Sequence, residues 1–276
     1  MTLQDAARRP LVPKFAPADD YTPFCEAVRR LCGVDLLQYK RGQMERRIRT
    51  WTARRGIEDL GAYARKLQSD PEELDAFLDR VTINVSQLWR HPEQWDYLAR
   101  AVLPDVLAAG SLRAWSAGSS YGAEAYTLAA VCGELGALKP GSRVRIKGTD
   151  IDRRMVERAR LGTFTAEDAR TAPRKPLERW FQPEGPGWRA GPALRAVTAF
   201  ETGDLLRLRP PTAAYDLVMC RNTVIYFTED VRNALHGRLA TALRAGGHLV
   251  VGATERISDP SSLGLKPVHP FVYRRT

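Results

Sequence analysis

Two hydrophobic patterns divide the chain, and the first is helical and covers residues 21–80. Apolar positions recur there at helical spacing; Met44, Ile48 and Trp51, for example, fall on one face of a helix. Helix-start residues agree with this spacing, since Asp70-Pro71 precedes two glutamates. The pattern predicts a small all-helical domain, with helices over Phe24–Cys32, Leu37–Arg55, Asp59–Leu67 and Glu72–Val81.

The second pattern begins at Leu112, where short apolar runs start to alternate with helical stretches. The runs have the length of buried strands, and the stretches between them can hold crossover helices. This alternation predicts an α/β domain with a doubly wound parallel sheet over residues 111–276. The expected strands are Leu112–Ala117, Val144–Asp150, Val197–Glu201, Asp216–Cys220, Leu249–Gly252 and Val268–Tyr273. The expected helices are Ala123–Leu135, Arg153–Leu161 and Glu229–Leu243.

Three further segments differ from these patterns in composition. Residues 1–20 are rich in proline, alanine and charge and predict a flexible tail. Residues 81–110 predict a junction followed by a linker helix over Glu93–Leu107. Residues from about 164 to 198 interrupt the strand–helix alternation with proline, glycine and tryptophan. They predict a small subdomain inserted into the sheet domain.

Composition limits the possible partners and the location. The chain has 276 residues and a formal net charge of +10, so nucleic acid, a membrane surface or an acidic protein would each fit. Its four cysteines lack CxxC and metal-ligand spacing, which favours reduced thiols and no metal site. The first residues lack the continuous apolar segment of a signal peptide, so we expect none, and no apolar run reaches spanning length. We therefore expect a cytoplasmic protein without membrane insertion, and a monomer by default.

Much of the positive charge is concentrated in residues 40–55, where Glu45 is the only acidic residue. The cations are Lys40, Arg41, Arg46, Arg47, Arg49, Arg54 and Arg55. Such a run forms either a solvated helix face or a docking surface for an acidic partner, and both interpretations stay open. Trp51 is the only aromatic residue among these cations. Because interleaved aromatic residues are typical of single-strand binding, nucleic acid is not the expected partner.

Polar residues follow the predicted strands at the edge where ligands bind in open α/β sheets. The strand ending at Cys220 continues into Arg221 and Asn222, with Tyr226 close behind. Residues 118–122 form a loop of small residues after another strand, and small residues let a backbone approach a ligand closely. The loop lacks the GxGxxG spacing of dinucleotide sites. It suits an adenosyl cofactor or is an ordinary tight turn.

Acidic residues end two more of the predicted strands. Asp150 is a candidate acceptor for both hydroxyls of a ribose, because a carboxylate is an acceptor with two oxygens. Asp152 is predicted to be the N-cap of the following helix. Asp204 either meets the amino group of an adenine or is a common turn residue.

In their order along the chain, these segments resemble the chemotaxis receptor glutamate O-methyltransferases, the CheR family, from about residue 21 onward. Val81–Arg90 resembles the family's T-x-N-x-T-x-F-F-R, and Trp115–Tyr126 resembles W-S-A-x-x-S-x-G-E-E-P-Y. The other resembling segments are Thr149–Asp152 (S-D-I-D), Gly203–Leu206 (N-L-L), Cys220–Phe227 (C-R-N-V-x-I-Y-F) and Val251–Glu255 (G-H-S-E). Each motif alone is weak, whereas their joint order is highly specific.

The resemblance implies a class I S-adenosylmethionine-dependent methyltransferase that forms glutamate methyl esters on the cytoplasmic signalling domain of chemoreceptors. Its cofactor would be S-adenosyl-L-methionine and its product S-adenosyl-L-homocysteine. The implied cofactor contacts are Asn84, Ser86, Arg90, Ala117, Glu124, Asp150, Asp204, Leu205, Arg221 and Asn222. Arg90 and Tyr226 are implied to flank the methyl group and the incoming glutamate as the catalytic residues.

The resemblance also assigns roles to the other domains. The helical domain over residues 21–80 would dock the acidic methylation region of the receptor's helical bundle. The docking residues would be Lys40, Arg41, Arg46, Arg47, Arg49 and Arg54. The insertion would be the family's β-subdomain, which in some members holds a receptor's C-terminal tether peptide. The segment from Trp180 to Phe200 is short, which favours a tether-independent member.

The chain also departs from the family motifs. Ala123 and Ala125 replace the first Glu and the Pro of G-E-E-P-Y, Leu88-Trp89 replaces Phe-Phe, and Asp204 replaces Asn. Two alternatives therefore stay open. The chain could be a divergent methyltransferase-fold module that binds cofactor or receptor without efficient catalysis, or a methyltransferase that acts on nucleic acid.

Overall fold

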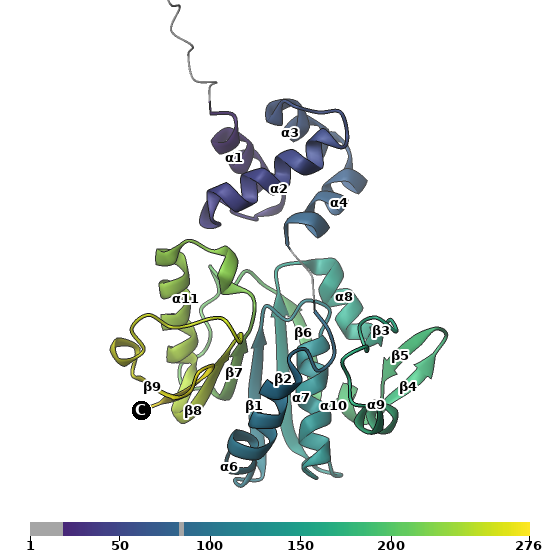
Figure 1. Ribbon diagram of the computed structural model, residues 1–276, viewed down its shortest axis with the longest axis vertical. Coiled ribbons are helices and arrows are strands. Elements are labelled where there is room, and N and C mark those ends of the chain that lie inside the picture. The colour runs from purple at the N-terminus through teal and green to yellow at the C-terminus, as the bar shows by residue number, and fades with distance from the viewer. Residues whose placement is uncertain (1–18, 83–85) are drawn as a thin grey trace, which may run out of the picture.

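The computed structural model describes residues 19–82 and 86–276, so most of the predicted tail and Asn84 lie outside the described residues. The helical domain has its own hydrophobic core and stands over the carboxyl ends of the parallel strands (Figure 1). Its helices are α1 (Tyr21–Cys32), α2 (Arg41–Ala53), α3 (Leu60–Ser69) and α4 (Pro71–Val81). The sequence prediction of a small all-helical unit is confirmed.

Capping residues explain where these helices begin and end. Asp59 accepts hydrogen bonds from the backbone of α3, and Asp70 does the same for α4, which has proline at its first position. Gly33 ends α1 in the left-handed conformation, with φ of 81°. The predicted helix Leu37–Arg55 was wrong at its start, because the chain forms a short 3-10 helix, η1 (Leu36–Gln38), and is extended at Tyr39 before α2 begins.

The large sheet has seven strands in the order β6-β2-β1-β7-β8-β10-β9. Its strands are β1 (Ser111–Ala117), β2 (Arg143–Asp150), β6 (Thr198–Thr202), β7 (Tyr215–Cys220), β8 (Leu243–Val251), β9 (Leu265–His269) and β10 (Val272–Arg275). The first five pair in parallel, which confirms the doubly wound sheet. The predicted single strand Val268–Tyr273 was wrong, because β9 and β10 form an antiparallel pair in this stretch.

Helices connect the parallel strands, as expected for crossover connections. α7 (Ala123–Glu134) joins β1 to β2, α8 (Arg153–Leu161) follows β2, and α11 (Glu229–Ala242) joins β7 to β8. The polar N-cap predicted at Asp152 is confirmed, since its carboxylate accepts from the amides of Arg154 and Met155. From β1, the chain first adds β2 and β6 on one side and then β7 and β8 on the other, so the strand order reverses between β1 and β7. Such a reversal is where ligands bind in open α/β sheets.

The insertion forms a small three-stranded antiparallel sheet with two short helices, at the right of Figure 1. Its elements are β3 (Thr163–Phe164), α9 (Arg174–Trp180), β4 (Phe181–Glu184), β5 (Gly187–Ala190) and α10 (Pro192–Val197). In the sequence between α4 and β1, the predicted linker helix is divided into three parts. They are α5 (Pro92–Tyr97), a π-helical turn η2 (Leu98–Val102) and α6 (Leu103–Leu107). Within the described ranges, no helix has the length and apolar character needed to cross a membrane.

Candidate functional site

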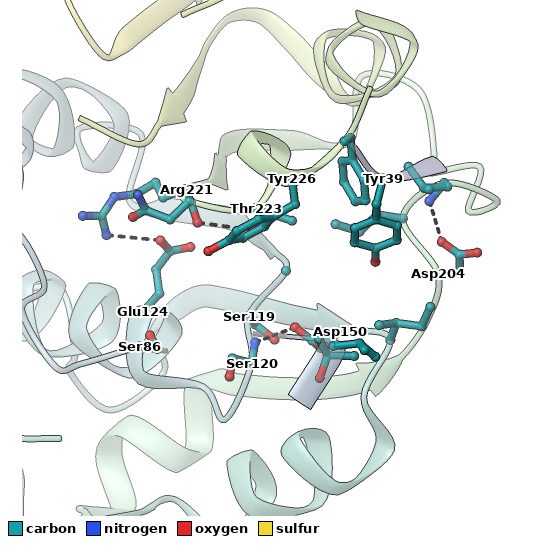
Figure 2. Close-up of a pocket in the computed structure, with 18 of the residues that line it drawn as sticks. Tyr39, Ser86, Ser119, Ser120, Glu124, Asp150, Asp204, Arg221, Thr223 and Tyr226 are labelled. Carbon is teal, nitrogen blue, oxygen red and sulfur yellow. Dashed lines mark hydrogen bonds and ion pairs between the residues drawn. The ribbon is translucent and has the colours of Figure 1, made fainter. Parts of the chain in front are cut away.

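A pocket lies between the two domains, over the carboxyl ends of β1, β2 and β7 (Figure 2). Both domains contribute to its walls. From the helical side come Val34, Asp35, Tyr39, Val81 and Thr82. From the junction and the sheet domain come Ser86, Gln87, Arg90, Gly118, Ser119, Ser120, Glu124, Asp150, Ile151, Asp204, Leu205, Leu206, Arg221, Asn222, Thr223, Tyr226 and Phe227.

Asp150 ends β2 on the floor of this pocket. Its carboxylate accepts hydrogen bonds from the amide of Ser120 at 2.7 Å and from the amide of Asp152 at 3.0 Å. Burial raises the pKa of Asp150 to about 6, against the opposing effect of these backbone donors. Asp150 is therefore a fixed carboxylate whose remaining acceptor positions face the pocket.

The loop after β1 owes its small residues to close packing. Gly118 has a φ of 78°, and a Cβ atom there would stand 2.4 Å from the hydroxyl of Thr223. Glycine removes this clash and tolerates the left-handed backbone. The next residues of the loop can then turn the amide of Ser120 toward Asp150, so the loops after β1, β2 and β7 meet in one place.

Arg221 follows β7 and is the centre of a buried polar network. Its guanidinium donates to the Gln94 side-chain oxygen at 2.6 Å and to the Arg90 carbonyl at 2.7 Å. It also pairs with Glu124 at 3.2 Å, and only 3% of the Arg221 side chain is exposed. The second oxygen of Glu124 accepts from the Ser116 hydroxyl at 2.7 Å. Arg221 therefore ties α5, the junction and α7 together at the pocket wall.

Asn222 is held by a buried carboxylate that sequence reasoning gave no role. The backbone amide of Asn222 donates to Glu255 at 3.0 Å, and the amide of Gly252 donates to the same oxygen at 2.6 Å. Asn222 has a φ of 58°, and asparagine adopts this left-handed conformation more readily than most residues. An asparagine at position 222 therefore suits the left-handed backbone of this turn.

The junction presents Arg90 to the pocket on an unusual backbone. Trp89 and His91, on either side of it, have φ values of 52° and 58°. Leu88 anchors the segment, since its amide donates to the carbonyl of Asp168 at 2.8 Å. Tyr121 adds a second anchor, because its hydroxyl donates to the carbonyl of Ser86. Non-glycine residues in this conformation are held by their surroundings and cluster at functional sites.

Tyr226 stands opposite this junction, in the 3-10 turn η3 (Val224–Tyr226). Its backbone carbonyl accepts from the amide of Lys40 at 2.9 Å. The guanidinium of Arg47, on α2, lies 6.0 Å from the centre of its ring. The phenol of Tyr226 therefore lies where the predicted docking helix meets the pocket.

Two family models match the chain. The model described as "CheR methyltransferase, all-alpha domain" matches residues 19–82, and the one described as "CheR methyltransferase, SAM binding domain" matches residues 84–267. The chain belongs to the CheR methyltransferase family. It is an S-adenosylmethionine-dependent methyltransferase.

Individual relatives agree with this assignment. A chemotaxis protein methyltransferase of Listeria monocytogenes is 33% identical over 93% of this chain and 97% of its own length. Chemotaxis protein methyltransferase 1 of Pseudomonas aeruginosa is 31% identical over 87% of this chain and 91% of its own. Nothing in these comparisons supports the nucleic-acid methyltransferase or the non-catalytic module that the sequence left open. The solved magnesium protoporphyrin IX methyltransferase of Synechocystis, with bound SAM, superposes with a TM-score of only 0.39.

The residue types in the pocket fit the cofactor of a CheR methyltransferase. S-adenosylmethionine carries two ribose hydroxyls, an adenine amino group and an ammonium, all of which donate hydrogen bonds. Four acidic residues line the pocket, and three of them, Asp150, Asp204 and Glu124, come from the sheet domain and offer carboxylates as acceptors. Leu205 adds an apolar side chain to the lining. The fourth, Asp35, pairs with Arg29. Among the described residues, no group of His, Cys, Asp and Glu has the arrangement of a metal site.

Most of the CheR-like residues named from the sequence line this one pocket. Ala117 is buried in β1 beside the lining residue Gly118, and Asn84 lies outside the described residues. The family departures Ala123, Ala125, Leu88 and Trp89 are buried and do not line the pocket. Sequence reasoning assigned no contact to Tyr39, Gln94 or Glu255. Tyr39 and Gln94 have partners more than a hundred positions away, Phe227 and Arg221. Glu255 stood within a motif segment, which by itself does not show what its carboxylate contacts.

Proposed function

We propose that this chain transfers the methyl group of S-adenosylmethionine to glutamate side chains in the cytoplasmic helical bundle of chemoreceptors, and that it works in the cytoplasm. One observation carries the proposal: a single pocket collects the family's motif residues directly beneath a strongly basic helix. On this view residues 21–80 are the docking domain, residues 81–110 the junction, and residues 111–276 the catalytic domain with its insertion at about 164–198.

Each of three carboxylates contacts a different part of the cofactor. Asp150 accepts from the ribose hydroxyls, Asp204 accepts from the adenine amino group, and Glu124 faces the ammonium of the amino-acid end. Asp204 is positioned for this by its neighbours, since one oxygen accepts from the amide of Leu206 at 2.8 Å. Arg221 holds Glu124 in place by an ion pair at 3.2 Å, and the Gln94 side chain and the Arg90 carbonyl fix its guanidinium. Ser86, Ala117 and Leu205 would add backbone and apolar contacts.

The chemistry needs alignment more than acid–base catalysis. A bound sulfonium cofactor supplies an electrophilic methyl group, and a glutamate carboxylate, with an ordinary pKa of about 4.3, is already ionised at neutral pH. Arg90 holds this carboxylate by charge-assisted hydrogen bonds, and Tyr226 fixes the angle of attack. One carbon–oxygen bond forms as one carbon–sulfur bond breaks, so no proton has to move. Alignment of this kind is worth effective molarities of about 10⁵ M or more.

Replacing Tyr226 with phenylalanine is expected to lower turnover about ten- to a hundredfold, the range for losing one hydrogen bond to a charged group. Affinity for S-adenosylhomocysteine should change far less, because the hydroxyl acts on the incoming carboxylate. Steady-state methyl transfer and calorimetric titration measure the two effects separately. An unchanged turnover number would remove Tyr226 from the reaction, and an equal loss in both measurements would move it into the cofactor site.

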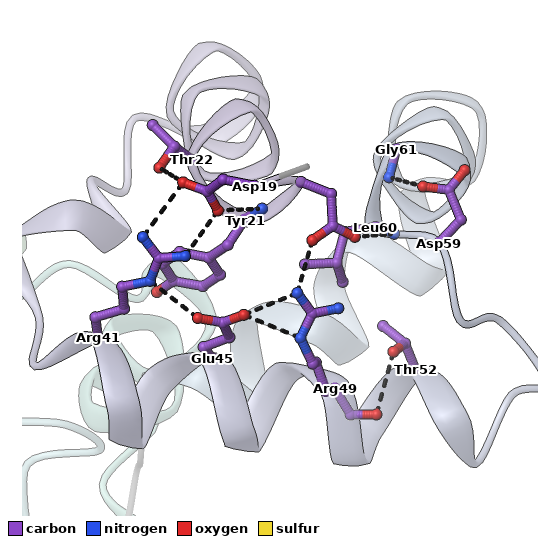
Figure 3. A network of polar contacts seen from close by, with 11 residues as sticks. Asp19, Tyr21, Thr22, Arg41, Glu45, Arg49, Thr52, Asp59, Leu60 and Gly61 are labelled. Carbon is purple, nitrogen blue, oxygen red and sulfur yellow. Dashed lines mark hydrogen bonds and ion pairs between the residues drawn. The ribbon is translucent and has the colours of Figure 1, made fainter. Parts of the chain in front are cut away.

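Two cations of the basic helix α2, Arg41 and Arg49, are paired with carboxylates (Figure 3), whereas others are not. Arg41 pairs with Asp19 at 2.7 Å, Arg49 pairs with Asp20 at 2.6 Å, and both also contact Glu45. Within the described part of the chain, Lys40, Arg46 and Arg54 are exposed and form no ion pair. The unpaired cations, with Arg47 beside Tyr226, are therefore the stronger candidates for receptor docking, and Arg41 and Arg49 serve first to hold the domain together.

Reversing the charge of both Arg46 and Arg54 to glutamate is expected to raise the KM for a receptor fragment about tenfold or more, because like charges would then face the acidic bundle. The loss should shrink at high salt, which screens exposed charges. Arg153→Glu makes the same type of change on an exposed helix of the sheet domain and should leave KM unchanged. An equal effect of the α2 and α8 variants would argue against α2 as the docking helix.

The experiment that tests the whole proposal has two steps. Calorimetric titration with S-adenosylhomocysteine should give binding in the micromolar range or tighter. Radiolabelled methyl transfer to fragments of receptor signalling domains should then produce base-labile glutamyl esters. Binding without transfer to any receptor fragment would overturn the substrate, and a lack of binding would overturn the assigned pocket.

A further inference from the structure

Tyr39 belongs to the helical domain, yet its side chain lines the pocket of the sheet domain (Figure 2). It occupies the extended residue between η1 and α2, where the predicted long helix is interrupted. Its ring packs against Phe227, with ring centres 5.0 Å apart at an angle of 65°. Neither the charge pattern nor the family motifs gave Tyr39 a role, although it immediately precedes the basic helix.

Backbone contacts fix this segment to the loop that carries Tyr226. The amide of Lys40 donates to the carbonyl of Tyr226 at 2.9 Å, and the amide of Thr228 donates to the carbonyl of Gln38 at 3.0 Å. Tyr39 and Phe227 thereby form an antiparallel β-bridge across the two domains. The position of the Tyr39 ring is consequently set by the same contacts that seat α2 on the catalytic loop.

The phenol of Tyr39 faces the end of the pocket that holds Asp150 and Asp204. Burial, followed by the charges of Asp204 and Asp150, raises the pKa of Tyr39, so it stays a neutral hydrogen-bond donor. No hydrogen bond of its hydroxyl to a described residue is formed. Tyr39 is partly buried, and its side chain lines the pocket with an apolar ring and a polar hydroxyl. A ligand that offers both a flat ring and polar groups at this end could contact both.

We propose that Tyr39 is a cofactor-binding residue supplied by the helical domain, and that its ring closes the adenosine side of the pocket. Cofactor binding then holds the helical domain against the catalytic loop, because Tyr39 and Tyr226 belong to one clamped pair of segments. This inference rests on the cofactor assignment and adds a residue from outside the sheet domain to it. By linkage, whatever seats α2 more firmly must also tighten cofactor binding.

Calorimetric titration of three variants with S-adenosylhomocysteine tests the proposal. Tyr39→Ala should raise the dissociation constant at least about tenfold, as expected for losing the ring contact. Tyr39→Phe keeps the ring and should cost only about threefold, the scale of one neutral hydrogen bond. Leu37→Ala changes an exposed residue of the neighbouring η1 turn and should bind like the parent protein. Binding by Tyr39→Ala within twofold of the parent would overturn the inference.

Two further measurements separate ligand contact from loss of structure. Methylthioadenosine lacks the amino-acid end, so Tyr39→Ala should weaken its binding by the same factor as that of S-adenosylhomocysteine. Hydrogen exchange of residues 36–53 should slow when S-adenosylhomocysteine binds the parent protein, and should not respond in Tyr39→Ala. A loss confined to S-adenosylhomocysteine would place Tyr39 at the other end of the ligand and overturn the assignment. If the parent protein itself does not bind S-adenosylhomocysteine, the result rejects the assignment of the cofactor pocket, which is a different outcome from rejecting the role of Tyr39.

Discussion

Replacing Arg221 with leucine should lower the free energy of unfolding by about 3–5 kcal/mol, the cost of leaving one partner of a buried ion pair alone. Glu124 would keep its charge but lose its cation, and only 12% of its side chain is exposed. Gln94 and the Arg90 carbonyl would lose their donor in the same step. Urea denaturation followed by circular dichroism measures the loss of stability. The Arg90 backbone should also lose its fixed position, because its carbonyl is hydrogen-bonded to Arg221.

Two controls make this result specific. Arg153→Leu removes an exposed arginine with an i,i+4 partner, Glu157, and should cost less than about 0.5 kcal/mol. Adding Glu124→Gln to Arg221→Leu removes the stranded charge, so the double variant should be more stable than Arg221→Leu alone. A stability loss as small as that of Arg153→Leu would contradict the view that Arg221 organises the pocket wall.

Replacing Asp150 with asparagine should weaken S-adenosylhomocysteine binding by about one to two orders of magnitude at pH 8, because hydrogen bonds to a charged acceptor are worth about 1.5–3 kcal/mol. The effect depends on pH in a defined direction. The pKa of Asp150 is held at about 6 by burial, and only its ionised form accepts from both hydroxyls. Affinity of the parent protein should therefore fall about tenfold per pH unit below pH 6, and that of Asp150→Asn should stay flat.

The Asp150 carboxylate should affect folding stability in the opposite direction with pH, so affinity and stability measurements can be told apart. The folded state raises the pKa of Asp150 above its ordinary value of 3.8, so it binds the proton more tightly than the unfolded chain does. Ionisation of Asp150 thus costs stability as the pH rises through this interval up to about 6. The ligand-free Asp150→Asn variant should melt no lower than the parent at pH 7. A variant that binds S-adenosylhomocysteine with parental affinity would exclude Asp150 from the ribose site.

Most of the departures from the family motifs lie in the packed interior and not in the pocket. Ala123 and Ala125 lie at the start of α7 with no exposed surface, and Trp89 stacks edge-on against Phe181 of the inserted subdomain. These residues therefore belong to the packing of α7, the junction and the insertion. Asp204 alone among them lines the pocket, and it remains an acceptor.

The sequence by itself determined the elements and the strand ends. Hydrophobic period and capping residues are local properties, so they placed the four helices of the first domain and the parallel strands within a few residues. The carboxyl ends of parallel strands share one edge of a sheet, and this topological rule was enough to bring Asp150, Arg221 and Asn222 together. The order of motifs was enough to indicate the family.

Only the tertiary structure decided which residues complete the site. Gln94 meets Arg221 from 127 positions away, Tyr39 reaches the pocket from the other domain, and Asp19 neutralises Arg41. The break in the helix before α2 and the turn between β9 and β10 were also missed. Each of these depends on contacts between segments distant in sequence, whose energy no local pattern records. Burial and pairing therefore separate the cations and carboxylates that are paired within the protein from those left to face the pocket or the surface.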